Sequence, residues 1–176
     1  LNHGVFLRDV SNPAAQETLR TPGYPMLLAL GLLIFKNVPG FVLFQNFLSL
    51  GSIILAYLLF VYIFKNKKIA LLPSAILAFD PATIYWNSQL STETFFTILL
   101  LLSIYTFFIF LGKTNWSSLA VSALALGWAN ITRPIVQYVL ILYAVVIIIQ
   151  AIYKYRPKIL YAILILAAVS GIIASP

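Results

Sequence analysis

The chain has 176 residues, of which 62% are hydrophobic and only 9% are charged. Soluble domains usually carry about 25% charged residues, so this composition excludes a water-soluble globular domain. The formal net charge of +7 comes from eleven Lys and Arg residues, most of which lie in short loops between apolar segments. This distribution is typical of membrane topology signals and of attraction to anionic lipids, so we expect membrane lipids and no nucleic acid among the partners.

The first 24 residues form the longest polar stretch of the chain, and we expect them to be a loop outside the membrane. A short apolar run at residues 25–36 follows the turn-forming sequence Pro22–Gly23–Tyr24–Pro25. A helix needs about 20 apolar residues to span a bilayer, and this run is too short. We therefore predict an interfacial helix at 25–36, with the prolines in a turn or in the first helical turn.

Six longer apolar segments follow, at residues 40–64, 69–86, 94–112, 117–131, 135–153 and 159–176. In lipid each segment must be helical, because a helix satisfies its backbone hydrogen bonds internally. The expected fold class is all-α: a polytopic transmembrane bundle of about six spanning helices plus the interfacial helix, within one transmembrane domain over 1–176. The chain starts without Met and stops inside an apolar run, so we expect a fragment that lacks both ends.

The basic loops indicate an orientation. If residues 25–36 do not span, Lys65–Lys68, Lys113 and the basic residues of 154–158 all face the cytoplasm. If they do span, with 1–24 outside, Lys65–Lys68 move outside, and the positive-inside rule favours the first arrangement. All four acidic residues then lie at or near the outer face. We expect a multi-pass protein of a bacterial or archaeal plasma membrane, with its active face outward.

Two of these four carboxylates adjoin apolar segments. Glu93 follows Ser91 and Thr92 at the start of a long apolar helix. It can act as a base, a metal ligand or an acceptor-positioning group, or it can simply stabilise a helix N-terminus that Ser91 or Thr92 caps. Asp80 precedes Pro81 within an apolar segment, where a carboxylate is costly. It either bonds backbone groups freed by the proline kink or has a functional role.

Arg20 and Arg133 are the candidate phosphate-binding residues, because a guanidinium group binds phosphate in a bidentate fashion. Both can instead be interfacial anchors whose charged groups reach toward lipid headgroups. Tyr24, Tyr85 and Trp86 lie near predicted membrane boundaries, where an aromatic belt explains them. Tyr85 and Trp86 are also placed to stack on a sugar.

The order of these features resembles the membrane region of GT-C fold glycosyltransferases, the group similar to protein O-mannosyltransferases and lipid A aminoarabinose transferases. The resemblance covers nearly the whole chain. The residues that carry it are Arg20–Pro25, Ala78–Pro81, Tyr85, Gln89–Phe96 and Ile131–Pro134, in that order.

The resemblance implies a polyprenyl-phosphate-linked sugar donor and an inverting transfer to an acceptor hydroxyl on the non-cytoplasmic side. The acceptor, whether protein, lipid or polysaccharide, stays open. In such enzymes an Asp in the first outer loop acts as general base. We expect it upstream of Leu1, with Asp9 as the candidate inside the chain. Glu93 corresponds to the second outer-loop acid, and Arg20 and Arg133 to phosphate contacts.

The remaining candidate substrate-binding residues are Tyr24, Asp80 and Tyr85. No cofactor is required by the sequence, although some relatives use a divalent metal ion. No cysteine is present and the only histidine is His3, so a thiol nucleophile and a histidine-rich metal site are excluded. Motifs for ATP binding, nicotinamide binding and zinc proteolysis are also missing.

Two other functions compete with the enzyme. A transporter or lipid flippase tends to place polar groups and broken helices near the bilayer midplane, often in inverted repeats. Here the polar groups gather toward one predicted face, and no convincing repeat occurs. A non-catalytic membrane scaffold is the third candidate, and it would not depend on Glu93, Arg20 or Arg133.

Overall fold

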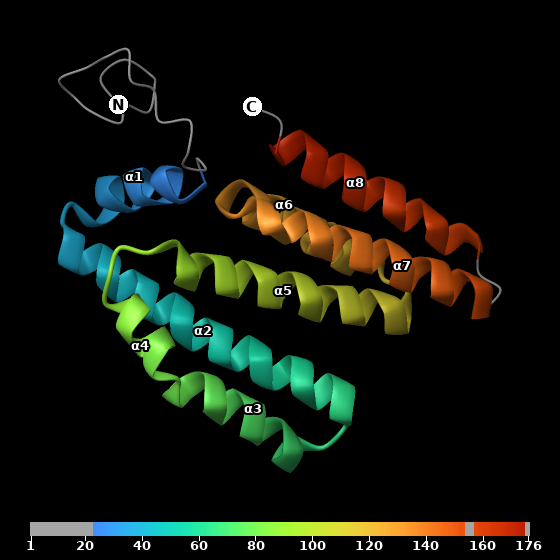
Figure 1. Ribbon diagram of the computed structural model, residues 1–176, viewed down its shortest axis with the longest axis horizontal. Helices are drawn as coiled ribbons and strands as arrows, with labels where there is room; N and C mark the ends of the chain where they lie inside the picture. The colour runs from blue at the N-terminus through green and yellow to red at the C-terminus, as the bar shows by residue number, and fades with distance from the viewer. Residues whose placement is uncertain (1–22, 154–156, 175–176) are drawn as a thin grey trace.

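The computed structural model describes residues 23–153 and 157–174 (Figure 1). Within these ranges every regular element is a helix and no strand occurs, so the all-α class is confirmed. The predicted site residues Asp9 and Arg20 lie outside the described residues. The helices are α1 (Gly23–Phe35), α2 (Val38–Phe64), α3 (Lys67–Phe79), α4 (Pro81–Asn87), α5 (Thr92–Lys113), α6 (Trp116–Thr132), α7 (Gln137–Tyr153) and α8 (Tyr161–Ala174), with short 3-10 helices η1 (Pro134–Val136) and η2 (Pro157–Leu160).

Asparagine residues mark the starts of three helices. Asn37, Asn66 and Asn115 precede α2, α3 and α6, and each side chain accepts a hydrogen bond from a backbone N–H of the first turn. These bonds satisfy donors that have no partner inside the helix. At the opposite ends, α2 and α5 stop at Lys65 and Thr114, which adopt left-handed backbone conformations with φ of 54° and 52°.

Fewer helices are long enough to span a membrane than the sequence predicts. Among the described residues, Val38–Phe64, Thr92–Lys113 and Pro134–Tyr153 have the length and composition of a span. The α3–α4 pair adds a fourth span only if its 52° bend lies within the membrane. Within the described residues the number of spans is therefore lower than the six expected. The segment 69–86 breaks where Pro81 cannot continue α3, and α6 and α8 have only 17 and 14 residues.

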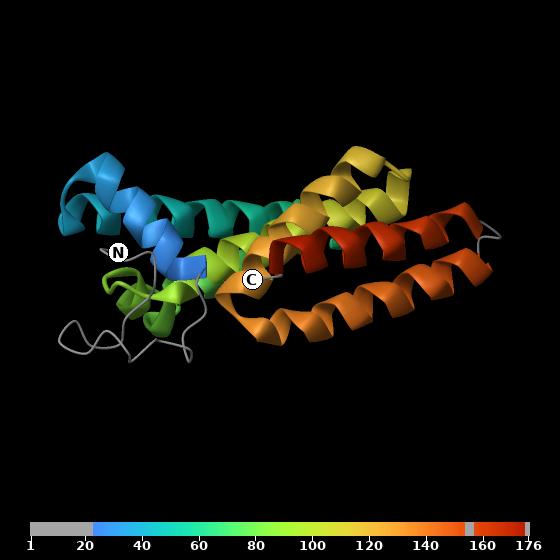
Figure 2. The same cartoon turned by 90° about the horizontal axis from the view of Figure 1, so that it is seen from above.

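The helices pack as a row in the order α3, α2, α5, α6 and α8 (Figure 1). Figure 2 shows α7 beside α8, outside the plane of this row. Helix α6, which lies between α5 and α8, buries mostly small residues, namely Ser122, Ala123, Ala125, Gly127 and Ala129, together with Leu119, Leu126 and Thr132. Small side chains let helix backbones approach closely, which strengthens van der Waals packing where lipid removes the usual hydrophobic driving force.

A hydrogen-bonded group links three helices in the apolar interior. Ser103 of α5 lies 3.1 Å from the hydroxyl oxygens of both Ser122 of α6 and Tyr143 of α7. The Tyr143 ring also stacks on Phe107, with their centroids 3.8 Å apart. Because polar groups in an apolar medium need partners, this group favours one relative register of α5, α6 and α7.

The two ends of the bundle differ in chemistry. Successive long helices alternate in direction, so the α2–α3 and α5–α6 turns share one end, which we call the lysine end for Lys65, Lys67, Lys68 and Lys113 (Figure 1). The starts of α2 and α5, the end of α6, and helices α1 and α4 lie at the opposite end, which we call the site end.

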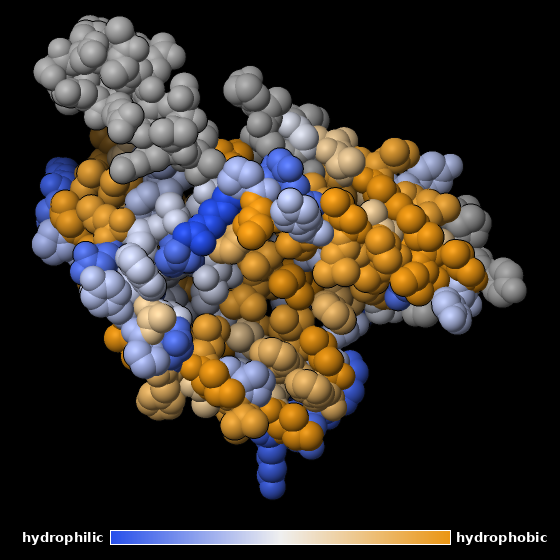
Figure 3. Space-filling model, viewed as in Figure 1, coloured by the Kyte–Doolittle hydropathy of each residue, from blue (hydrophilic) through white to orange (hydrophobic). Residues whose placement is uncertain are grey.

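Apolar side chains cover much of the outer surface. Figure 3 shows them over α3, α7 and α8, whereas polar residues gather near α4 and the start of α5. Large apolar side chains are exposed along several helices, including Leu33, Ile76 and Leu164. Lipid tails cover such a surface favourably, whereas water does not. The chain is therefore a multi-pass integral membrane protein.

Candidate functional site

A polar stripe runs along the buried face of α2 at the site end. Gln45, Ser49 and Ser52 are spaced four and three residues apart, so they lie on one side of the helix. All three are buried, and Gln45 has no exposed surface. This spacing within an otherwise apolar segment is a signal that our reading of the sequence missed.

Asn87 ties three helices together. Its Nδ2 donates a hydrogen bond of 2.7 Å to Ser49 Oγ on α2, and its Oδ1 accepts one of 2.6 Å from Thr94 Oγ1 on α5. Asn87 is the last residue of α4, and all three side chains are buried. The bonds fix the end of α4 between α2 and the first turn of α5. Neither Asn87 nor Thr94 was a candidate from sequence.

Tyr24 supports the site from α1. Its hydroxyl donates to Gln45 Oε1 at 3.4 Å, and Gln45 Nε2 donates to the backbone carbonyl of Ser91 at 3.2 Å. Burial raises the pKa of Tyr24 to about 12, so this hydroxyl keeps its proton at physiological pH. Tyr24 was predicted to bind substrate. It is buried against Phe41 and holds the segment that leads into α5.

Glu93 and Arg133 form an ion pair at the site end. Glu93 lies in the first turn of α5, and Arg133 directly follows α6. The Arg133 guanidinium also donates to Thr92 Oγ1 at 3.2 Å and lies 5.4 Å from the centre of the Phe96 ring. Both charged side chains are 38% exposed. Two candidates 40 residues apart in sequence are thus in direct contact.

The α1 helix packs against the segment that carries Arg133. A Cβ atom added at Gly23 would lie 2.9 Å from the Ile131 carbonyl carbon and 2.8 Å from Thr132 Oγ1. Such distances are shorter than real side chains tolerate, so only glycine allows this approach. Gly23 thereby lets the start of α1 approach the end of α6.

Asp80 has a local structural role. It is the N-cap of α4, and its Oδ2 accepts hydrogen bonds from Thr83 N at 2.8 Å and Thr83 Oγ1 at 2.6 Å. This agrees with the local interpretation, in which Asp80 bonds backbone groups near the Pro81 break. Its carboxylate nevertheless also lines the neighbouring cavity.

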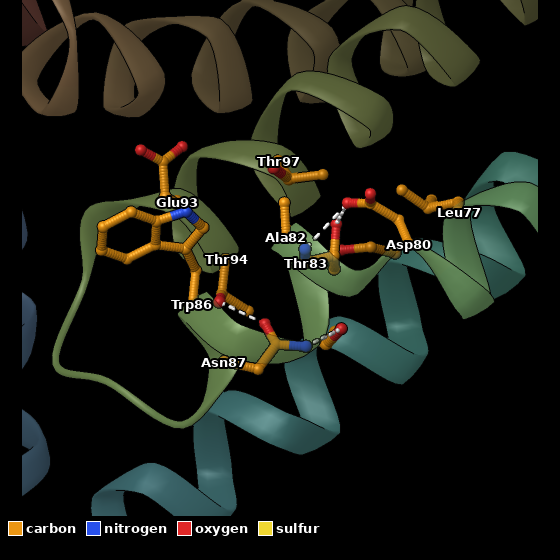
Figure 4. Close-up of a pocket in the computed structure, with 11 residues that line it drawn as sticks. Leu77, Asp80, Ala82, Thr83, Trp86, Asn87, Glu93, Thr94 and Thr97 are labelled. Atoms are coloured by element: carbon orange, nitrogen blue, oxygen red, sulfur yellow. Dashed lines mark hydrogen bonds between the residues drawn. The ribbon is translucent and has the colours of Figure 1, made fainter.

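A polar cavity of about 310 Å³ lies between α2, α3, α4 and α5 (Figure 4). Figure 4 shows Asp80 and Glu93 on opposite sides of it, and its lining includes Ser52, Thr83, Trp86 and Thr97. Tyr85, a predicted sugar contact, is 59% exposed and meets the edge of Trp86 without lining the cavity. The aromatic lining is therefore Trp86.

The arrangement combines a cation, a carboxylate and a space for a ligand. Glu93 lines the cavity and also forms the ion pair with Arg133. A change in the charge of either group therefore alters the electrostatic environment of the other. An anion that binds Arg133 competes with Glu93 for the same guanidinium N–H donors. In residues 23–153 and 157–174 no group of three or more His, Cys, Asp and Glu residues occurs that could hold a metal ion.

These features define a polytopic all-α membrane protein with a polar, ion-paired site at one end of its bundle. A protein-family model described as dolichyl-phosphate-mannose-protein mannosyltransferase matches residues 19–174, and the chain belongs to this family. No curated protein and no solved structure matches it significantly. Membership confirms the resemblance to GT-C enzymes and assigns the chain to glycosyltransferases of the mannosyltransferase type.

Proposed function

We propose that the site transfers a sugar from a polyprenyl-phosphate-linked donor to an acceptor hydroxyl on the non-cytoplasmic side of the membrane. The observation that carries this proposal is the Glu93–Arg133 pair at the edge of a polar cavity, in a chain of the mannosyltransferase family. The pair lies at the end of the bundle opposite the basic loop Lys65–Lys68. The positive-inside rule predicts that this basic loop faces the cytoplasm.

Arg133 binds the donor phosphate in this proposal. The acceptor oxygen attacks the anomeric carbon of the sugar, and the bond from that carbon to the phosphate oxygen breaks. Polyprenyl phosphate leaves with the bonding electrons, so negative charge grows on its oxygen atoms. A guanidinium held in place by Thr92 and the Phe96 ring stabilises this charge without having to reorganise. Arg20 is the second proposed phosphate contact.

Glu93 is the proposed base that takes the acceptor proton. The phosphate of the donor displaces the Glu93 carboxylate from Arg133, which leaves the carboxylate available to the acceptor hydroxyl. Donor binding and base activation are thereby coupled through one guanidinium. Asp9 is the other proposed acid of this chain, and Tyr24, through Gln45, orients the segment before Glu93.

Substitution of the phosphate-binding arginine tests the function. We expect Arg133→Gln to lower the rate of transfer from a radiolabelled polyprenyl-phosphate sugar by roughly 10- to 100-fold. This factor corresponds to the free energy that one hydrogen bond to a charged group contributes. The assay uses membranes that contain the full-length protein at matched levels. Lys113→Gln, at the lysine end, is the matched control and keeps wild-type activity. Normal transfer by both Arg133→Gln and Arg20→Gln would contradict the assignment and favour a non-catalytic scaffold.

A further inference from the structure

The cavity between α2, α3, α4 and α5 is lined by carboxylate, hydroxyl and aromatic groups. We propose that it is a binding site for one neutral sugar ring, carried by the donor or by the acceptor, and this inference rests on the proposed function. Its volume of about 310 Å³ is at the lower end of the range of roughly 300–1,000 Å³ that small-molecule sites occupy. A site of this size suits a single small polar ligand.

The charges of the lining favour a neutral ligand over a phosphate. Asp80 and Glu93 both contribute carboxylates, and no Lys or Arg occurs among the described residues that line the cavity. Two carboxylates repel an anion, whereas they accept hydrogen bonds from the hydroxyl groups of a sugar. The phosphate therefore belongs at Arg133, outside the cavity.

The remaining lining suits the other surfaces of a sugar. The Thr97 hydroxyl can donate and accept hydrogen bonds, as sugar hydroxyl groups do, and Thr83 Oγ1, which donates to Asp80, can still accept one. The Trp86 indole offers an apolar face for the C–H groups of the ring. Ser49, Asn87 and Thr94 bond to one another and hold this part of the lining in place before a ligand arrives.

The position of Glu93 connects the cavity to the phosphate site. Glu93 lines the cavity and also contacts Arg133, so a ring inside the cavity lies next to a phosphate bound by Arg133. This is the relation between the sugar and the phosphate in a glycosyl phosphate donor. The geometry therefore favours the donor ring, and an acceptor sugar is the alternative source of the same chemistry.

Two variants change the cavity without touching Arg133. Thr97→Val removes a hydroxyl at nearly constant volume, and Ala82→Leu fills the space. Matched controls are Thr106→Val on the same helix, where the hydroxyl bonds Leu102 of its own helix, and Ala75→Leu on the exposed side of α3. We expect Thr97→Val to raise the KM for the donor roughly three- to tenfold, a typical effect of one lost hydrogen bond. Ala82→Leu raises it further, and both controls stay at wild-type values.

Inhibition by sugar-free polyprenyl phosphate separates the ring from the phosphate. We expect its Ki to stay unchanged in Thr97→Val and Ala82→Leu, whereas Arg133→Gln raises it. A rise in the acceptor KM alone assigns the cavity to an acceptor sugar. Equal increases in the donor KM and in this Ki, or no change in either KM for both variants, would overturn the proposal.

A binding measurement keeps the inference separate from the proposed function. In detergent-solubilised protein with Trp116 and Trp128 changed to Phe, we expect methyl α-mannoside to cause a saturable change in Trp86 fluorescence. Ala82→Leu abolishes this change. If the wild type showed no transfer from any polyprenyl-phosphate sugar, the function would fail while this sugar titration still supported the cavity. A flat titration together with an unchanged donor KM would reject the cavity alone.

Discussion

At the scale of single residues, the Glu93–Arg133 pair is the centre of the proposed site. Each partner is partly exposed, so the pair itself contributes little stability, roughly 0–1 kcal/mol by analogy with exposed pairs. Its importance lies in competition, because the same guanidinium cannot bind Glu93 and a phosphate with all of its donors at once. In the proposed reaction, Glu93 thus controls both the availability of Arg133 and the acceptance of the acceptor proton.

This competition predicts a separation of binding from catalysis in Glu93→Gln. We expect the Ki of sugar-free polyprenyl phosphate to fall about two- to fivefold, because Arg133 no longer has an anionic partner. We expect kcat to fall at least about 100-fold, because the base is lost. Steady-state kinetics with the radiolabelled donor measure both. Glu93→Asp should restore part of the kcat. A normal kcat in Glu93→Gln would transfer the role of base to Asp9 or to another acid.

At the scale of elements, the short helix α4 brings lining residues to the cavity. Asp80 starts it, Trp86 lies near its end, and Asn87 anchors that end to α2 and α5. The break at Pro81 is what allows α4 to turn by 52° away from the line of α3. A continuous helix over 69–86, as the apolar pattern predicts, would not place these side chains beside Glu93.

The anchoring role predicts a loss of stability in Asn87→Leu. Ser49 and Thr94 would lose their buried partner, which costs about 1–3 kcal/mol and lowers Tm by roughly 2–10 °C. Thermal unfolding of the detergent-solubilised protein measures this. Asn46→Leu is the matched control, because Asn46 is exposed on α2 and bonds only the carbonyl of Val42 among the contacts described. Equal Tm values for both variants would show that α4 is held by other contacts.

At the scale of the whole molecule, the main feature is that the two ends of the bundle carry different chemical groups. Alternating helices bring Lys65, Lys67, Lys68 and Lys113 to one end, and the ion pair and cavity to the other. A lipid carrier presents its phosphate at a membrane surface, so a site at one end of a bundle is well suited to it. The proposed transfer requires this end to face away from the cytoplasm.

The lack of cysteine makes the orientation directly testable. We expect a membrane-impermeant maleimide to label Gln89→Cys in intact cells, and to label Lys67→Cys only after the cells are permeabilised. Both positions are exposed, one at each end of the bundle, in an otherwise cysteine-free background. The reverse pattern would put Glu93 and Arg133 on the cytoplasmic side and contradict the proposed transfer.

The helical class and most helix positions follow from the sequence, because runs of apolar residues and capping asparagines act over short distances. Glu93, Arg133 and Asp80 were likewise recognisable as candidates, since charged groups are rare in such a chain. The number of spans was not predictable from apolar length alone, because the 69–86 segment breaks at Asp80–Pro81. The sequence did not identify three further polar residues of the site, Gln45, Ser49 and Asn87. Their role depends on hydrogen bonds to residues of other parts of the chain.

What the sequence determined by itself is therefore a lipid-embedded set of helices with opposite chemistry at its two ends. Only the tertiary structure decided that Glu93 meets Arg133, that Asn87 bonds Ser49 and Thr94, and that Trp86 faces the cavity while Tyr85 does not. The reason is physical. Local patterns specify where a helix starts and which medium it prefers, but contacts between residues about 40 positions apart depend on how whole helices pack against each other.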